Sequence, residues 1–402
     1  MATTGRILTT HVGSLARPHD LLDMMKARLT GKSYDKTTYD ARVSKAVADI
    51  VRQQVACGID IVADGEQSKP GFFSYVSERL EGFQPMPDRK LNLFAAEMAA
   101  FPEYYAQYFK EAMLGGMLMP FVPLVCTGPV KYRDLEPLKR DIANLKAAVK
   151  AAKAKGAFMP AVAPSGIGIN DYYKNAEDYY HAVGAAMSVE YNAIIDAGLM
   201  LQVDDPFLPD ILVDPTLDAK QKRKLAWIYV ESINESIKGI PAEKVRFHTC
   251  FGINEGPRIH EAPMDEVARY MLKINAGAYS FENANVRHEH EYHIWEDIKL
   301  PDGKKLIPGM ILHASNIVEH PKLIAERLVR FAKLVGRDNV IAGGDCGFSS
   351  QASYKPEVHP TVVWAKFQAM RDGAKLASKQ LWKKKASVKK SGTAKKAAKK
   401  KM

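Results

Sequence analysis

The chain has 402 residues, 47% of them hydrophobic, so it can bury a large core in one α/β barrel or in two ordinary domains. Its formal net charge is +11, and the eleven lysines between Lys379 and Met402 equal this whole excess, which leaves the remainder neutral. The composition therefore excludes a strongly basic or acidic folded body, and the charge marks only a terminal segment.

The N-terminal residues 1–18 have no long apolar stretch, and no run of about 18 apolar residues occurs anywhere in the chain. We therefore expect a cytoplasmic protein without a secretory signal or a membrane span. Cys57, Cys126, Cys250 and Cys346 are widely scattered, which favours reduced thiols or metal ligands over a disulfide framework.

Short β-branched runs alternate with longer helical patterns, as expected for parallel strands linked by helical crossovers. The candidate strands are residues 6–14, 58–66, 119–129, 158–166, 198–206, 244–252, 277–283, 308–315 and 339–347. Eight such units predict an α/β fold of the (β/α)8 TIM-barrel type. Because nine runs occur, we expect the run at 158–166 to be an extra strand or part of an elaborated crossover.

Two segments depart from this alternation. Residues 80–118 are rich in Met, Phe and Tyr and too long for a simple loop, so they predict a helical insertion over one barrel mouth. Residues 377–402 contain mostly Lys, Ala and Ser, which predicts a disordered basic tail. The expected organisation is a single barrel over residues 1–376, which includes the insertion, followed by the tail.

Reactive or ligand-like side chains stand at the C-terminal ends of most candidate strands. They are Ser14, Glu66, Asp204, Asp205, His248, Cys250, Glu282, His313, Asp345 and Cys346. In a parallel barrel these ends meet at the face where active sites are built. The sequence therefore predicts that residues far apart in the chain become neighbours.

His248, Cys250, Glu282 and Cys346 together supply an imidazole, two thiolates and a carboxylate, a tetrahedral set that suits zinc. His248 and Cys250 are two residues apart and so point to the same side of a strand. Either residue alone is better explained as a satisfied interior histidine or a small buried cysteine. Their joint placement with Glu282 and Cys346 on three strand ends favours a metal site.

Eight short motifs follow one another between residues 9 and 348. They are "TTHVGS", "DGEQSKPGFF", "TGPV", "LQVDDP", "FHTCFG", "YSFEN", "HASNIVEHP" and "GGDCGF". This ordered series resembles the catalytic C-terminal barrel of the cobalamin-independent methionine synthase family and the single-barrel proteins related to it. The resemblance independently implies that His248, Cys250, Glu282 and Cys346 are zinc ligands.

The same resemblance assigns Ser14, Glu66 and Asp204 to the amino-acid part of homocysteine. The serine strand end would face the carboxylate, and the two acids would hold the ammonium through charge-assisted hydrogen bonds. Helix capping or a structural ion pair is the alternative role for such acids, and we expect this alternative for Asp205.

The activity implied by the resemblance is zinc-dependent transfer of a methyl group to a thiol, with homocysteine as the acceptor and methionine as the product. A coordinated thiol loses its proton and becomes the nucleophile. Zinc would activate and orient it. Glu282, the weakest ligand, is the candidate to loosen when the thiol arrives.

His313 departs from the family pattern. The family's general-acid histidine stands one residue before a serine, whereas the run "LHAS" places His313 two residues before Ser315. A one-residue slip turns a side chain to the opposite face of a strand. His313 is therefore the proton donor only if the backbone bulges or Ser315 is the wrong anchor. The alternative is a histidine packed outside the barrel.

The methyl donor is left open, because the family's full-length enzyme carries a second, folate-binding N-terminal barrel for which this chain has no room. The candidates are a methyltetrahydrofolate, a methylated corrinoid protein and a small methylated metabolite. An alternative acceptor is coenzyme M, whose sulfonate would need cations such as Lys69 and Arg17. Glu66 and Asp204 favour an amino-acid thiol instead.

A second alternative is a nonenzymatic, nucleic-acid-associated protein that uses its Lys-rich tail and a structural zinc. Structural zinc sites usually close with local Cys and His pairs, whereas these ligands extend from His248 to Cys346. The tail itself predicts only nonspecific contacts with nucleic acid. The run "VRHEHEYH", which contains His288, His290 and His293, is interpreted as a solvated or substrate-covering segment rather than a metal site.

Overall fold

The structure is a computed structural model that describes residues 5–89, 94–113, 117–118, 122–252 and 256–383. Its centre is an eight-stranded parallel sheet in the order β1-β11-β10-β9-β8-β7-β5-β2. A parallel bridge between Thr10 and Ile61 joins the two end strands, so the sheet closes on itself. The expected (β/α)8 barrel is confirmed.

The barrel strands are short, as the brief β-branched runs of the sequence predict. They are β1 (Leu8–Thr9), β2 (Ile61–Val62), β5 (Gly156–Val162), β7 (Met200–Asp204), β8 (Val245–His248), β9 (Ala278–Phe281), β10 (Lys305–Ile311) and β11 (Ile341–Gly344). A separate three-stranded sheet contains β3 (Leu80–Pro85), β4 (Leu124–Tyr132) and β6 (Ile169–Asn170).

The expectation about the ninth strand was wrong in its location. The run at 158–166 forms β5, a barrel strand between β2 and β7. The run at 119–129 instead contributes to β4, which pairs with β3 and β6 outside the barrel. Burial gives the reason, because β5 is buried continuously over its last five positions whereas β4 alternates between buried and exposed side chains. Continuous burial, as in β5, is typical of a strand that is covered on both faces.

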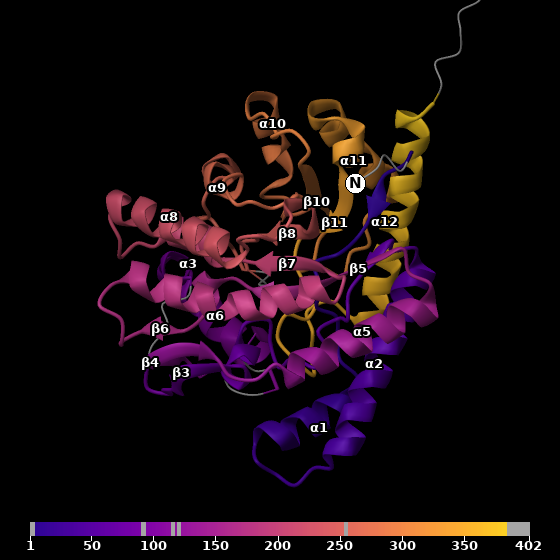
Figure 1. The fold of residues 1–402 in the computed structure, drawn as a ribbon. Coiled ribbons are helices and arrows are strands. Elements are labelled where there is room, and N and C mark those ends of the chain that lie inside the picture. Colours follow the sequence, from indigo (N-terminus) through magenta and orange to yellow (C-terminus); the bar gives the residue numbers. More distant parts are fainter. Residues whose placement is uncertain (1–4, 90–93, 114–116, 119–121, 253–255, 384–402) are drawn as a thin grey trace, which may run out of the picture.

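Helices surround the barrel (Figure 1). They are α1 (His19–Leu29), α2 (Lys36–Cys57), α5 (Glu136–Ala152), α6 (Ala176–Asp196), α7 (Phe207–Val213), α8 (Ala219–Ser236), α9 (Met264–Met271), α10 (Ile294–Asp297), α11 (Pro321–Val335) and α12 (Pro360–Leu381). Short 3-10 turns cover Ser74–Glu78, Pro164–Gly166, Ala242–Lys244, Glu289–His293 and Arg337–Asn339. Among the described helices, none combines the length and apolar character that crossing a membrane requires.

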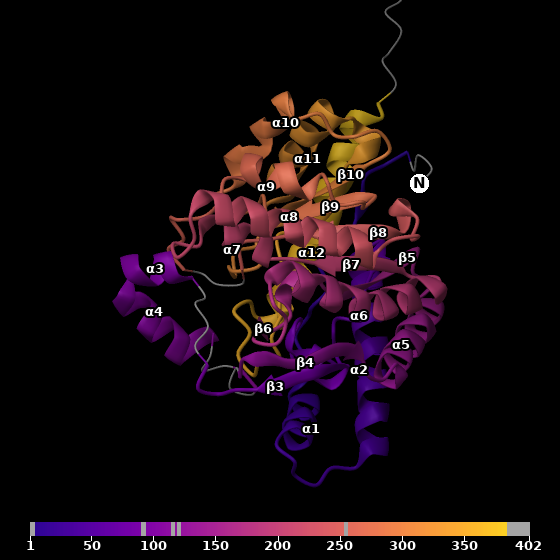
Figure 2. The same cartoon turned by 60° about the vertical axis from the view of Figure 1, so that its left-hand side comes forward.

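The insertion at residues 80–118 is helical only in its second half. It begins with β3 and continues, after residues outside the described ranges, into α3 (Ala95–Ala100), α4 (Pro102–Tyr108) and a π-helical turn at Phe109–Met113. Figure 2 shows α3 and α4 standing out to one side of the barrel, away from α12. Phe94 and Glu97 of this segment line the main cavity, so the insertion does border a barrel mouth.

Helix α12 continues beyond the boundary expected for the tail. It packs against α11 and α2 and ends at Leu381, with Ala377 fully buried. The guanidinium of Arg337 donates a hydrogen bond to the Leu381 carbonyl at 2.6 Å and stacks over Trp382. Residues 377–381 therefore belong to the folded body, and residues 384–402 of the predicted tail lie outside the described residues.

Strand β8 shows how the barrel directs its polar residues inward. Val245 and Phe247 pack in the main hydrophobic core, whereas Arg246 and His248 alternate with them. Arg246 is fully buried, donates hydrogen bonds to the Thr10 hydroxyl and the His11 carbonyl at 2.9 Å, and lies over the Phe158 ring. His248, two residues after Arg246 on the same face of the strand, lies at the carboxyl end of the barrel.

Candidate active site

Three of the four expected ligands meet at the carboxyl ends of β8 and β11. The ligand atoms of His248, Cys250 and Cys346 all lie within 4.8 Å of one another, and all three residues are buried. The two sulfur atoms are 3.2 Å apart. Zinc-type bonds of about 2.0–2.3 Å place tetrahedral ligand atoms roughly 3.3–3.8 Å from each other. These residues therefore fit a metal ion that prefers sulfur and imidazole nitrogen.

Glu282 follows the last residue of β9 and does not belong to the group formed by His248, Cys250 and Cys346. Its Oε1 accepts a hydrogen bond from the Phe251 N–H at 3.0 Å, and its side chain is buried. Burial, followed by the nearby charge of Asp345, raises the pKa of Glu282 to about 8. The structure thus brings three expected ligands together and leaves the fourth one strand away, bound to the backbone that follows Cys250.

Asp204 orients the imidazole of His248. Its Oδ1 lies 3.1 Å from Nδ1 of His248 and also accepts a hydrogen bond from the Gln202 side chain at 2.7 Å. With the proton on Nδ1, the other ring nitrogen keeps its lone pair for a metal. A carboxylate behind a histidine ligand is the usual way to fix that tautomer.

Asp345 joins the two loops that carry Glu282 and Cys346. It is fully buried and accepts hydrogen bonds from the backbone N–H groups of Asn283, Ala284 and Asn285, each at 2.8 Å. Burial raises the pKa of Asp345 to about 6, while these three donors oppose that shift. The sequence signalled only an acid before Cys346, and nothing in it showed which backbone groups the acid would bind.

Ser14, Glu66 and Asp204 border one cavity together with His248, Cys250 and Cys346. The cavity has a volume of about 760 Å³ and is bordered by all six of these residues. Five phenylalanines also border it, a feature that the sequence analysis missed because these residues are dispersed along the chain. These residues are Phe72, Phe73, Phe83, Phe94 and Phe207.

Glu66 is the most conspicuous polar group in this cavity. It is buried, it has a left-handed backbone conformation with φ of 54°, and its Oε2 has no hydrogen-bond partner among the described residues. Burial raises the pKa of Glu66 to about 7, against the opposing charges of Lys69 and Arg17. An unpaired buried carboxyl is costly and so marks a place for a ligand. Ser14, by contrast, is within 3.3 Å of the Ser350 hydroxyl.

Asp205 caps α7, which confirms its expected role. Its Oδ1 accepts hydrogen bonds from the N–H groups of Phe207 and Leu208, both at 3.1 Å. Asp204 and Asp205 are adjacent in the chain and so point in opposite directions, one to the barrel interior and one to the following helix.

His313 lies inside the protein because β10 contains a bulge. Gly309 pairs with Gly343 and Ile311 pairs with Gly344, so Met310 is the additional residue. The His313 ring is buried and its Nε2 donates to the Gly252 carbonyl at 3.2 Å. Burial lowers the pKa of His313 to about 3, which keeps the ring neutral. His313 lines a small cavity of about 50 Å³ beside the main one.

Lys69 and Arg17 are committed to backbone carbonyls. Lys69 donates to the Pro160 carbonyl at 2.7 Å, and Arg17 donates to those of Glu66 and Lys69 at 2.9 Å. Neither belongs to the described residues that border the main cavity. They brace the strand ends and do not face a ligand, so the cationic groups considered for a sulfonate are used elsewhere.

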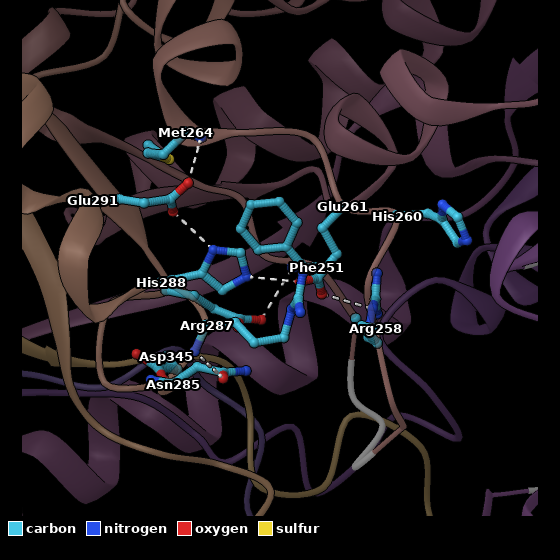
Figure 3. A network of polar contacts seen from close by, with 12 residues as sticks. Phe251, Arg258, His260, Glu261, Met264, Asn285, Arg287, His288, Glu291 and Asp345 are labelled. Atoms are coloured by element: carbon cyan, nitrogen blue, oxygen red, sulfur yellow. Dashed lines mark hydrogen bonds and ion pairs between the residues drawn. The ribbon is translucent and has the colours of Figure 1, made fainter.

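The three histidines of "VRHEHEYH" have different environments. His290 and His293 are exposed, but His288 is buried between two carboxylates, so the interpretation of this histidine as solvated was wrong. Figure 3 shows its ring against Phe251 and close to Glu261 and Glu291. One of its two partners, Glu291, belongs to the motif, whereas the other, Glu261, comes from a distant part of the chain.

Searches with family models find no match to the chain. The chain is 24% identical to a methionine synthase of Sulfolobus acidocaldarius over 84% of its own length and 85% of that protein. It is 22% identical to a methionine synthase of Saccharolobus islandicus over 94% and 97% of the two chains.

Two solved structures share the fold over nearly their whole length. A B12-independent methionine synthase from a Shewanella species, in complex with selenomethionine, superposes with a TM-score of 0.69 at 19% identity over 94% of this chain and 99% of that one. A putative vitamin-B12 independent methionine synthase from Listeria monocytogenes gives a TM-score of 0.64 at 19% identity over 92% and 99%.

The fold and the site together define a class, the (β/α)8 barrels that gather an imidazole and two sulfurs at the carboxyl ends of their strands. Within that class, these relatives and structures support the similarity of the chain to the cobalamin-independent methionine synthase family. The resemblance carried by the eight motifs is confirmed.

Proposed function

We propose that this protein is a methyltransferase that moves a methyl group to the sulfur of homocysteine, and that zinc is its metal. One observation carries the proposal. His248, Cys250 and Cys346 border the same cavity as Ser14, Glu66 and Asp204. The proposed metal site and the proposed site for the amino-acid end of homocysteine would therefore face one space. The two sequence relatives described above are both named methionine synthase, which supports the same activity.

The metal site would be built by His248, Cys250 and Cys346, with Glu282 as the fourth candidate ligand. Bound zinc would lower the pKa of a coordinated thiol and hold the resulting thiolate in place. Glu282 already has an alternative partner in the Phe251 N–H. This supports its proposed role as the ligand that loosens when a substrate sulfur arrives.

The amino-acid end of homocysteine would be held by Glu66, Asp204 and Ser14. The ammonium provides the partner that the buried Oε2 of Glu66 lacks. Its positive charge would lower the pKa of Glu66 from about 7 and favour the ionised form. The Ser14 hydroxyl, in the loop that follows β1, would face the carboxylate.

In the transfer itself, the homocysteine sulfur forms a bond to the methyl carbon. The bond from that carbon to the donor atom breaks, its electron pair stays on the donor, and the donor then takes up a proton. His313 is the candidate for this proton because the β10 bulge turns it inward. Its pKa of about 3 would have to rise when a negatively charged leaving group forms nearby.

The methyl donor would enter through the part of the cavity that the five phenylalanines border. Parallel assays with a methyltetrahydrofolate, a methylated corrinoid protein and a small methylated metabolite would distinguish the three candidate classes. Coenzyme M is a weaker candidate acceptor, since Lys69 and Arg17 are bound to backbone carbonyls while Glu66 is unpaired.

Zinc analysis combined with X-ray absorption at the zinc edge tests the proposal. We expect one zinc per chain and one additional sulfur neighbour when homocysteine is added, with no such change on adding coenzyme M. A first shell that does not respond to homocysteine, together with no transfer from any of the three donors, would overturn it.

A further inference from the structure

We propose that His288 is a positioning residue for the metal site, which holds Phe251 and thereby fixes both the Cys250 backbone and the Glu282 carboxylate. The inference rests on the proposed zinc-dependent function and adds to it a residue outside the expected ligand set.

His288 is clamped between two carboxylates, with a hydrogen bond at Nδ1 and an ion pair at Nε2. Its Nδ1 lies 2.8 Å from Glu291 Oε2 and its Nε2 lies 3.1 Å from Glu261 Oε2, and its exposed fraction is 3% (Figure 3). Burial opposes a charge on the ring, but these two carboxylates outweigh it and raise the pKa of His288 to about 10. The ring is therefore held as an imidazolium in one orientation.

The clamped ring lies flat on Phe251. The two ring centroids are 4.0 Å apart and the ring planes differ by 6°. A cation on the face of an aromatic ring is attracted to it, and the attraction is stronger in a buried place. Phe251 therefore has a rigid platform on one side.

Phe251 connects this platform to two members of the metal site. It follows Cys250 directly in the chain, and its N–H donates to Glu282 Oε1 at 3.0 Å. A shift of Phe251 would move the Cys250 backbone and remove the hydrogen bond that places Glu282. Metal sites tolerate such shifts poorly, because groups outside the ligand set orient the ligands.

The clamp is itself tied to neighbouring segments. Glu261 also pairs with Arg258 at 2.8 Å and with Arg287 at 2.7 Å. Glu291 Oε1 accepts a hydrogen bond from the Met264 N–H at 2.9 Å, at the start of α9. Arg258 and Glu261 border the main cavity, so the same network reaches from the cavity wall to the loop behind Cys250.

His290 and His293 provide matched controls from the same motif. Both are exposed; His293 lies 2.8 Å from Glu296, and its ring centroid lies 4.0 Å from that of Tyr292. Replacing them changes the same residue type within five positions of His288 without touching Phe251. Any effect of composition or of general stability near this turn would appear in all three variants.

The experiment measures zinc affinity of the full-length protein by competition with a chromophoric chelator, and it records the thiolate-to-metal absorption after cobalt substitution. We expect His288→Ala to weaken zinc binding by about 10–100-fold and to change the cobalt spectrum, as substitutions behind metal ligands do. His290→Ala and His293→Ala should stay within about twofold of the unmodified protein.

A double-mutant cycle separates positioning from a merely structural role. Phe251→Leu removes the stacking partner and should weaken zinc binding to a similar degree, and His288→Ala should add little in the Phe251→Leu background. If the two losses add in full, or if folded His288→Ala binds zinc as the unmodified protein does, the inference is wrong.

Two further outcomes are distinguishable. If His288→Ala does not fold, Glu291→Gln is the substitute, since it keeps the Oε1 acceptor for Met264 but removes one charge from the clamp. Unchanged zinc affinity in Glu291→Gln and Phe251→Leu would then overturn the inference. If the unmodified protein binds no zinc, the proposed function itself fails, and the inference with it.

Discussion

Three buried carboxylates on the two sides of the cavity, Asp345 and Glu282 on one side and Glu66 on the other, differ in their hydrogen-bond partners. On the side of β8, β9 and β11, Asp345 accepts three backbone N–H groups and Glu282 accepts one. On the side of β1 and β2, the Oε2 of Glu66 has no partner among the described residues. The first side is thus organised in advance, whereas the second keeps an unpaired carboxyl that a ligand would satisfy.

This difference indicates a division of labour. A site that holds its ligands through fixed hydrogen bonds suits a resident metal, because the ligands do not have to be reorganised for each turnover. A buried carboxyl with an unpaired oxygen suits a substrate that comes and goes and brings its own positive charge. Asp204 belongs to both sides, since it borders the cavity and orients His248.

The largest expected effect is on the organised side. Cys250→Ser should abolish stable zinc binding and methyl transfer, because it removes a thiolate from a group whose three atoms lie within 4.8 Å. The loss should exceed the roughly 10–100-fold that changes behind the ligands cause. Metal content and transfer rate are the measurements. Cys57→Ala, a buried cysteine outside the cavity, is the control and should keep its zinc.

Glu66→Gln should weaken homocysteine binding without affecting the proposed metal site. A charge-assisted hydrogen bond contributes about 1.5–3 kcal/mol, so we expect homocysteine affinity to fall by roughly 10–150-fold while zinc content stays unchanged. The matched probe is 4-mercaptobutanoate, which lacks the amino group. The unmodified protein should discriminate strongly between the two thiols and the variant should not; equal discrimination in both proteins would contradict the assignment.

The raised pKa of Glu66 predicts a dependence on pH. Because this pKa is about 7 and burial is its main cause, the carboxyl is mostly protonated below pH 7 and gains its charge above it. Ammonium binding needs the charged form, so homocysteine affinity should rise as pH increases from 6 to 8. Calorimetric titration at several pH values would measure this. The same series on Glu66→Gln accounts for the titration of the homocysteine thiol. The rise in affinity with pH should therefore be larger in the unmodified protein than in the variant.

Gly309 tests whether the organised side depends on close packing. A Cβ at this position would lie 1.7 Å from Asp345 Oδ1, which is already bound to the Asn283 and Ala284 N–H groups. Gly309→Ala should therefore cost about 1–3 kcal/mol of stability, as overpacking does, and it should weaken zinc binding. Thermal unfolding would measure the loss of stability. Gly156→Ala in β5 is the control, because its Cβ would meet its nearest neighbours at 3.7 Å.

The inner end of the cavity was largely predictable from sequence. Strand ends of a parallel barrel converge, so residues as distant as His248 and Cys346 could be placed together from motif positions alone. The same rule located Glu66 and Asp204 correctly in the cavity. Only local patterns and one general property of the fold were needed.

Other features depend on tertiary contacts that no local pattern encodes. The bulge that turns His313 inward arises from the pairing of β10 with β11, and the burial of His288 depends on Glu261, which is far from it along the chain. The exchange of roles between β4 and β5 has the same origin, because what covers a strand decides whether it belongs to the barrel. Periodicity identifies such strands without saying which sheet they join.

The smallest effect is expected at the C-terminus, and it would show that neither side of the cavity depends on the tail. Removing residues 384–402 should leave zinc content, homocysteine affinity and transfer rate unchanged, because the residues that border the cavity lie between Val12 and Ala352. Removing residues 377–402 should instead lower the unfolding temperature, since it deletes buried Ala377 and the Leu381 carbonyl that Arg337 binds. Abolished transfer in the shorter deletion, with a folded barrel, would favour a function based on the lysines over the proposed one.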